Sequence, residues 1–109
     1  MFEILKKFFA KNYESLDGTA FREKYRSTKN AVLIDVRTPA EFKSGSIRGA
    51  RNINYLSASF VKSVEHLDKK KVYFLVCRSG SRSGGACSKM SAIGFQVFNL
   101  SGGIGAWQD

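Results

Sequence analysis

The feature that most constrains the fold is an unbroken hydrophobic segment that runs directly into a cysteine. Residues Val72–Val76 are all hydrophobic, and Cys77 follows them. A run of this length without alternation is typical of a strand that is buried on both faces, as in a parallel sheet. A short loop comes next, and then a helical pattern begins. The sequence therefore predicts a buried parallel strand that ends at Cys77 and connects through a loop to a helix.

The loop after this strand has the composition of an anion site. It consists of Arg78, Ser79, Gly80, Ser81, Arg82 and Ser83. A helix N-terminus offers unpaired backbone N–H groups and a positive dipole end, and a cysteine placed there ionises readily because its thiolate is stabilised. Gly80 allows a backbone conformation that other residues resist. We predict that Cys77 is a nucleophile held by the loop N–H groups and by serine hydroxyls. Arg82 is expected to point toward the mouth of the site, and Arg78 either assists it or is solvated.

Strand and helix patterns alternate along the rest of the chain. Strands are predicted over residues 13–16, 31–34, 52–55, 72–76 and 95–100, and helices over 20–26, from 39 to about 43, over 58–67, from the loop to 93, and over 104–107. The helix over 58–67 is expected to begin after a Ser57 cap and to turn Phe60, Val61 and Val64 inward. This alternation predicts an α/β domain over residues 13–109, with a mainly parallel central sheet of about five strands. Residues 1–12 are predicted to form an amphipathic helical extension that packs onto the domain or makes a surface, dimer or weak membrane contact.

The net charge indicates the class of partner. Eighteen Lys and Arg residues against nine Asp and Glu residues give a formal charge of +9. Such an excess favours anionic partners, from small sulfur or phosphorus oxyanions to nucleic acid or acidic proteins, and part of it aids solubility. No Lys/Arg run is longer than residues 69–71, and neither an arginine-rich arm nor an aromatic RNA-binding signature is present. We therefore do not expect a nucleic-acid-binding protein.

The chain has two cysteines, Cys77 and Cys87, and one histidine, His66. They form neither a CxxC motif nor a disulfide framework, and they are too few for a structural zinc site, so no metal is expected. A Cys77–Cys87 disulfide needs Cα atoms within about 7 Å, whereas the helical spacing gives roughly 15 Å. Cys87 is therefore assigned to core packing and His66 to the surface. Because the sequence contains no membrane-length apolar stretch and no signal peptide, we expect a reduced, cytoplasmic protein with no membrane partner.

Four segments of the chain form a recognisable set. They are Leu33–Phe42, Gly45–Ile53, Cys77–Ser83 and Leu100–Trp107. In this order and spacing they resemble a single-domain rhodanese, a sulfurtransferase-type domain, from about Tyr13 to the end of the chain. The visible departure is Ser46, where the family usually has a His that is associated with loop packing. The resemblance implies a mainly parallel sheet with helices on both faces.

The resemblance also implies a reaction. In the family, the cysteine that matches Cys77 takes a sulfane sulfur from a donor such as thiosulfate, becomes a persulfide and passes the sulfur to cyanide or a thiol. This implies an enzyme of the thiosulfate:cyanide sulfurtransferase type without a cofactor. Its partners would be a small anionic sulfur donor and a thiol or cyanide acceptor, and a protein donor or acceptor is also compatible.

Two polar residues follow the predicted strand over residues 31–34. Asp35 and Arg37 lie at a strand end, where α/β sheets place functional groups. We expect Arg37 to pair with Glu41 across the start of the next helix, and Asp35 to hold neighbouring loops by hydrogen bonds. Because the family's matching Asp lies near the active site, Asp35 and Arg37 are both interpreted as supporting residues.

Two other functions share much of this pattern. Phosphatase and arsenate-reductase loops also place a Cys before an anion cradle that ends in Arg, and the family's phosphatase relatives have one more loop residue. Only four residues separate Cys77 from Arg82, and this smaller ring suits a sulfur atom better than a phosphoryl group. The other alternative is a non-enzymatic sulfur-carrier or sensory module that receives persulfide from a protein partner. It shares every residue of the loop, so the sequence leaves it open.

Overall fold

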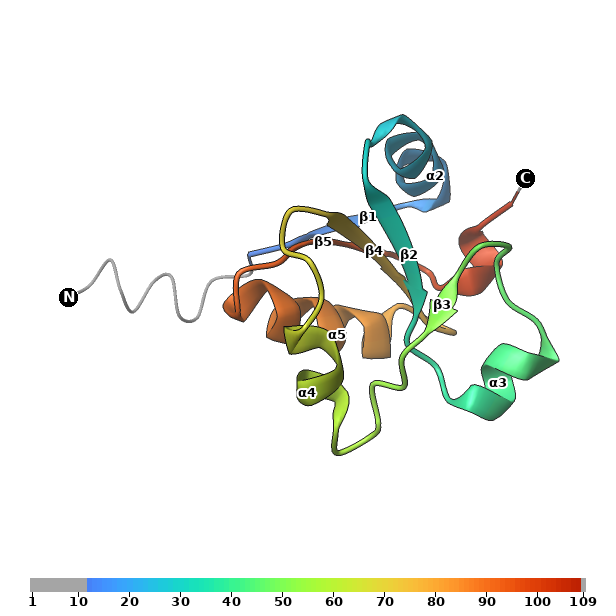
Figure 1. The fold of residues 1–109 in the computed structure, drawn as a ribbon. Coiled ribbons are helices and arrows are strands. Elements are labelled where there is room, and N and C mark those ends of the chain that lie inside the picture. The colour runs from blue at the N-terminus through green and yellow to red at the C-terminus, as the bar shows by residue number, and fades with distance from the viewer. Residues whose placement is uncertain (1–11, 109) are drawn as a thin grey trace.

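The structure is a computed structural model that describes residues 12–108, and its centre is a parallel sheet (Figure 1). The described residues form five strands: β1 (Glu14–Leu16), β2 (Ala31–Asp35), β3 (Arg51–Asn52), β4 (Val72–Val76) and β5 (Gln96–Leu100). Every pairing is parallel, in the order β1-β5-β4-β2-β3. The predicted α/β fold is confirmed, and β4 lies in the middle of the sheet.

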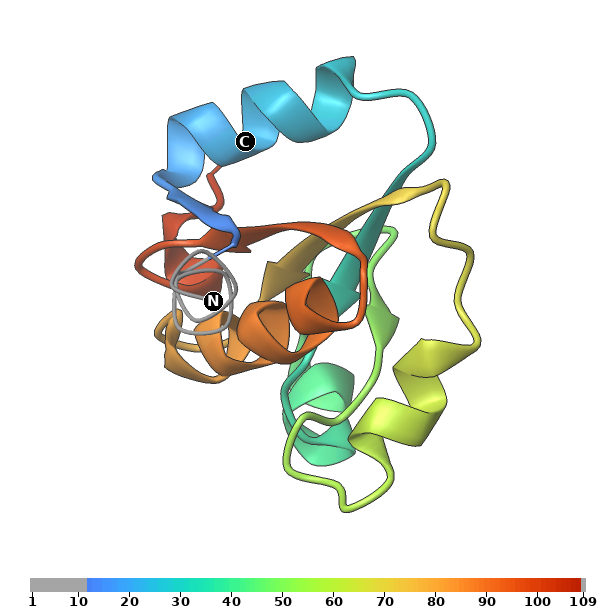
Figure 2. The ribbon, with the colours of Figure 1, turned by 90° about the vertical axis from the view of Figure 1, so that its left-hand side faces the viewer.

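Helices cover both faces of the sheet. They are α2 (Gly18–Ser27), α3 (Pro39–Ser44), α4 (Phe60–Glu65), α5 (Ser81–Ala92) and the 3-10 helix η1 (Ile104–Ala106). Figure 2 shows α2 above the sheet and α5 below it. Phe21 of α2 and Trp107 after η1 pack in the upper core, whereas Phe60 of α4 and Met90 of α5 pack in the lower core. No helix among residues 12–108 is long and apolar enough to cross a membrane.

The position of β4 explains its unbroken hydrophobic sequence. Side chains alternate between the two faces of a strand. Tyr73 and Leu75 pack with α4 and α5, while Phe74 and Val76 pack with α2 on the opposite face. All four side chains are at most 1% exposed. The strand is therefore buried on both faces, as predicted.

Local capping chemistry positions the first two helices. The Asp17 side chain accepts a hydrogen bond from Ala20 N (2.9 Å) at the start of α2. Thr38 and Glu41 form a reciprocal capping box at the start of α3, with Pro39 in its first turn. This arrangement is the one that the sequence predicts, because both partners lie within one helical turn.

Three predictions on local structure need correction. The segment predicted as a strand over 52–55 is regular only at Arg51–Asn52, although Ile53 N and Tyr55 N still donate to β2 and to the residue that follows it, Val36. Helix α4 begins at Phe60 rather than at residue 58, and its N-cap is Ser59 rather than Ser57. Val61 is 40% exposed, because a helix of six residues turns only Phe60 and Val64 inward. The predicted extension over residues 1–12 lies almost wholly outside the described residues.

Candidate active site

Cys77 lies at the carboxyl end of β4, in the loop that leads into α5. Its side chain is buried, with no exposed area. The Gly80 N–H donates to Cys77 Sγ (3.1 Å), and the Ser83 hydroxyl lies 3.3 Å from the same sulfur. Open parallel sheets place ligand sites at this edge. The structure therefore brings Cys77, Gly80 and Ser83 together as the sequence predicts.

The turn at Gly80 makes this contact possible. Gly80 has φ 96° and ψ −7°, a left-handed conformation that glycine adopts without a Cβ penalty. Gly80 precedes the first residue of α5, and its carbonyl accepts from Gly84 N (3.0 Å). The backbone thus turns from β4 into α5 so that one N–H points back at the sulfur.

The environment of Cys77 favours its thiolate. Burial is the largest single influence and raises the pKa of the thiol. The Ser83 hydroxyl and the backbone N–H groups of Ser83, Ser79 and Gly80 lower it, and together they outweigh burial, so the pKa of Cys77 lies below its ordinary value. The chain's one histidine, His66, is 83% exposed beside Glu65 and takes no part. Thiolate formation at Cys77 therefore depends on hydrogen-bond donors of the loop.

Arg82 does not point freely toward the mouth of the site, which corrects our expectation. Its guanidinium binds Glu41 in a bidentate ion pair, with N–O distances of 2.7 and 3.0 Å. This contact holds the pKa of Glu41 at about 2 and raises that of Arg82. The pair ties the first turn of α5 to the first turn of α3. Arg82 therefore fixes the loop and brings little unpaired charge to it.

The prediction that Arg37 pairs with Glu41 is also wrong. Arg37 instead binds Asp35 through Nε and Nη2 (2.8–3.0 Å), and its Nη2 donates to Gly45 O (2.6 Å). The Ser46 hydroxyl donates to Asp35 Oδ2 (2.7 Å). Asp35 thus joins the end of β2 to the loop after α3, as predicted for Asp35. Ser46, the departure from the family pattern, takes part in this packing.

The side chains of the other predicted loop residues make no hydrogen bond to the sulfur, although the Ser79 backbone N–H contributes to its environment. Arg78, Ser79 and Ser81 are exposed. Ser81 N donates to Ser79 Oγ at 3.4 Å, so this hydroxyl serves the turn. Of the three serine hydroxyls in the predicted loop, Ser83 is the one within hydrogen-bond distance of Cys77.

Comparisons with known proteins decide the family. Residues 19–109 match the rhodanese-like domain. The chain belongs to the rhodanese-like domain family. It is 35% identical to YtwF of Bacillus subtilis over 95 residues, covering 87% of this chain and 90% of that protein. It is 33% identical to the thiosulfate sulfurtransferase GlpE of Pseudomonas putida, covering 76% and 74% of the two chains. The crystal structure of a rhodanese-like domain protein from Staphylococcus aureus superimposes with a TM-score of 0.75 at 28% identity, covering 88% and 92%.

A buried residue that the sequence interpretation missed also supports the loop of this rhodanese-like domain. Asn99 of β5 is 5% exposed, and its Nδ2 donates to Gly80 O (3.2 Å) and Ser15 Oγ (3.1 Å). Its Oδ1 lies 2.5 Å from Ser83 Oγ. The sequence does contain a sign of this role, because Asn99 is the polar residue in the otherwise apolar run 97–100. An amide buried in such a strand needs hydrogen-bond partners.

The C-terminal segment forms the other wall of the loop. Ile104 N donates to Cys77 O (2.7 Å), and a Cβ on Gly103 would collide with the Arg78 carbonyl. Beside this wall lies a depression of about 370 Å³. Its lining consists of Gly45, Ser46, Ile47, Arg48, Ile104 and Trp107. The rhodanese-like domain therefore presents a hollow with one cationic side chain next to the backbone of Cys77.

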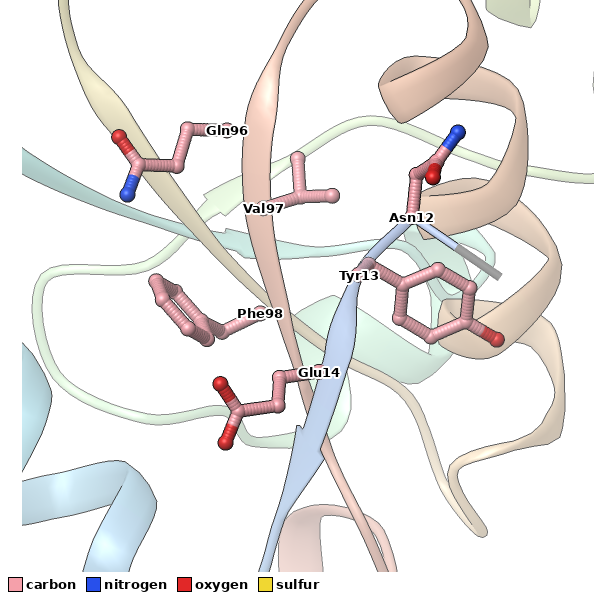
Figure 3. Close-up of a pocket in the computed structure, with 6 residues that line it drawn as sticks. All are labelled: Asn12, Tyr13, Glu14, Gln96, Val97 and Phe98. Atoms are coloured by element: carbon pink, nitrogen blue, oxygen red, sulfur yellow. The ribbon is translucent and has the colours of Figure 1, made fainter. Parts of the chain in front are cut away.

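A second hollow lies at the opposite end of the sheet (Figure 3). Its lining comes from the start of β1 and of β5 and consists of Asn12, Tyr13, Glu14, Gln96, Val97 and Phe98. Val97 pairs with Tyr73, four residues before Cys77, so this hollow is remote from the loop along the strands. Cys87 is buried on α5 in the lower core, as predicted, and neither cysteine forms a disulfide.

Proposed function

We propose that this chain is a sulfurtransferase that moves a sulfane sulfur from thiosulfate, or another small anionic donor, to cyanide or a thiol through a persulfide on Cys77. The observation that carries the proposal is the buried Cys77 sulfur with the Gly80 N–H and the Ser83 hydroxyl aimed at it. Membership of the rhodanese-like family and similarity to a thiosulfate sulfurtransferase support the same reaction.

In the first half-reaction the Cys77 thiolate attacks the outer sulfur of thiosulfate. A bond forms between Sγ and that sulfur, the bond to the sulfonate sulfur breaks, and sulfite leaves with the electron pair. The negative charge moves from Sγ to the outer sulfur of the persulfide. The Gly80 N–H and neighbouring loop N–H groups stabilise these anions without reorganising, because the turn fixes their directions.

In the second half-reaction the acceptor attacks the outer sulfur. With cyanide, a C–S bond forms, the persulfide S–S bond breaks, and the electron pair returns to Cys77 Sγ as thiocyanate leaves. With a thiolate acceptor, the outer sulfur leaves as the acceptor's persulfide. Both half-reactions balance without an external oxidant, reductant or cofactor, so the loop residues of this chain suffice.

The anionic donor needs positive potential near the loop. Because Arg82 is paired with Glu41, we assign this task to Arg78, which is exposed in the loop, and to Arg48, which lines the adjacent depression. Asp35 and Arg37 would act as supports that hold the Gly45–Ser46 wall. A cytoplasmic location completes the proposal.

The test is the intact mass of the protein after incubation with thiosulfate. The wild type and a Cys87→Ala control should each gain the mass of one sulfur atom, and cyanide should remove it and release thiocyanate. Cys77→Ser should gain nothing. Turnover of thiosulfate by Cys77→Ser would overturn the mechanism.

Parallel arms separate the alternatives. Thiosulfate, 3-mercaptopyruvate and a persulfide-loaded cysteine desulfurase are offered separately, and loading from the desulfurase alone would indicate a carrier module instead of a free-standing enzyme. An aryl phosphate serves as the phosphatase probe. Hydrolysis of that ester that depends on Cys77 would contradict the preference for sulfur.

A further inference from the structure

The Ser83 hydroxyl lies between two groups that can each accept its hydrogen in a hydrogen bond. Ser83 Oγ is 3.3 Å from Cys77 Sγ and 2.5 Å from Asn99 Oδ1. A serine hydroxyl has one hydrogen, so it can donate to only one of the two acceptors at a time. Ser83 is 0% and Asn99 5% exposed, so the two acceptors compete in a buried place.

The orientation of the Asn99 amide follows from its other partners. Asn99 Nδ2 lies 3.2 Å from Gly80 O, and a carbonyl oxygen can only accept. Nδ2 also donates to Ser15 Oγ on β1. The amide nitrogen must therefore face Gly80 and Ser15, which leaves Oδ1 facing Ser83. An amide turned the other way would set two oxygens against each other at Gly80.

We propose that the Ser83 hydroxyl is a two-position donor and that Asn99 is the positioning residue that holds its second position. When Cys77 Sγ is a thiolate, the hydroxyl hydrogen points at the sulfur. When Sγ carries no charge, as a thiol or within a persulfide, the hydrogen turns to Asn99 Oδ1. A neutral thiol can then donate its own hydrogen to Ser83 Oγ.

This role rests on the proposed sulfur transfer and follows the charge on Sγ through it. Persulfide formation removes the charge from Sγ, and Asn99 gives the released hydroxyl hydrogen a partner, so that no buried donor is left unpaired. Attack by the acceptor returns the electron pair to Sγ, and the hydroxyl turns back to stabilise the leaving thiolate. The motion is a rotation of the Ser83 hydroxyl about its Cβ–Oγ bond, and no proton is transferred between residues.

The two positions give Asn99 and Ser83 opposite effects on the thiolate. Ser83 lowers the free energy of the thiolate by donating to it, whereas Asn99 competes for the same hydrogen and stabilises the uncharged state. Removal of the Asn99 side-chain oxygen should therefore make Cys77 ionise more easily. A residue that only supported the loop would have the reverse effect, because a loosened loop donates less well to the sulfur.

Other ionisable groups near the loop stay the same in the test. They are Arg82 of α5 with its partner Glu41 of α3, Asp35 at the end of β2 with Arg37 after it, Arg78 in the loop, and Tyr13 beside Gly84, while Cys87 of α5 is replaced by alanine in every protein compared. Gly80 O keeps its bond from Gly84 N when Asn99 is replaced, so the turn retains one anchor.

The experiment measures the rate of Cys77 alkylation by iodoacetamide as a function of pH. All proteins carry Cys87→Ala, so that Cys77 is the one thiol that iodoacetamide can alkylate. Asn99→Leu keeps the size of the side chain and should speed alkylation about three- to tenfold below the wild-type pKa, whereas Ser83→Ala should slow it by a similar factor. In the Ser83→Ala background, Asn99→Leu should change the rate by less than about twofold, because the shared hydrogen is gone.

Slower alkylation of Asn99→Leu, or the same acceleration with and without Ser83, would overturn the proposal. Asn99→Asp is the second variant, in case Asn99→Leu folds poorly in a thermal melt. Its carboxylate would retain the hydroxyl hydrogen, so alkylation should slow in the presence of Ser83, and an acceleration would contradict the proposal. Alkylation requires no sulfur donor, so failure of persulfide formation with thiosulfate would count against the proposed function and leave this test intact.

Discussion

A single methyl group at Gly103 should displace the loop that holds Cys77. A Cβ built on Gly103 would overlap the Arg78 carbonyl and the Ser79 nitrogen. Both groups belong to the segment that turns toward the sulfur. Gly103 also has φ 78° and ψ −171°, a conformation that is almost confined to glycine. Gly103→Ala therefore combines backbone strain with a collision against backbone that cannot rotate away.

The neighbouring glycines separate these two costs. A Cβ on Gly102 meets only the Ala106 side chain at an ordinary 3.5 Å, but φ there is 84°, so Gly102→Ala should lose about 1–2 kcal/mol of unfolding free energy from strain alone. Gly105 has open space and no positive φ, so Gly105→Ala should be neutral or gain about 0.4–1 kcal/mol. Gly103→Ala adds overpacking to strain and should lose about 2–6 kcal/mol.

Urea unfolding of the three variants gives the stabilities, and Cys77 alkylation reports the loop. We expect the order Gly105→Ala, Gly102→Ala, Gly103→Ala from most to least stable, with a fall in melting temperature of at least about 8 °C for Gly103→Ala. Under native conditions only Gly103→Ala should also change the alkylation rate at neutral pH. If Gly103→Ala is as stable as Gly102→Ala and reacts normally, the close approach of Gly103 to the loop is refuted.

Two further predictions concern the ion pairs near the loop. The pKa of Glu41 falls from 4.5 to about 2 on folding, so its contribution to stability is fully present above pH 4.5 and disappears as the pH falls through about 2. The stability difference between wild type and Glu41→Gln in urea melts should shrink over that window, and a constant difference would contradict this pairing. Asp35→Ala leaves the buried charge of Arg37 unpaired and should cost about 3–5 kcal/mol in urea unfolding. A loss below about 1 kcal/mol would show that the pair behaves like an exposed one.

Features encoded within a few residues were predictable from the sequence. The hydrophobic run before Cys77 predicts a strand buried on both faces, and burial of Tyr73 and Phe74 on opposite sides confirms it. Thr38 and Glu41 predict the start of α3 because a capping box needs only residues three apart. Helix α4 was less predictable, since its exposed Val61 breaks the apolar pattern that suggested a longer inward face.

Contacts between distant segments were not predictable in the same way. Local spacing pairs Glu41 with Arg37, four residues earlier, but its partner in the structure is Arg82, which lies 41 residues later. Asn99 meets Gly80 only because β5 pairs in parallel with β4 and ends beside the loop. The position of Cys77 at the end of a buried strand could therefore be predicted from the sequence, whereas the groups that hold its loop depend on the order and register of the strands.

The pairing of Arg82 bears on which anion the loop is suited to hold. A phosphoryl group carries several charged oxygens and is best met by a guanidinium with unoccupied N–H groups. In this chain the Arg82 guanidinium already donates two hydrogen bonds to the Glu41 carboxylate. An oxyanion would therefore have to displace that carboxylate before it could bind Arg82. A single sulfur anion needs only the donors that already face Cys77, the Gly80 N–H and the Ser83 hydroxyl. The occupied arginine and the four-residue spacing are independent observations, and both favour sulfur as the cargo.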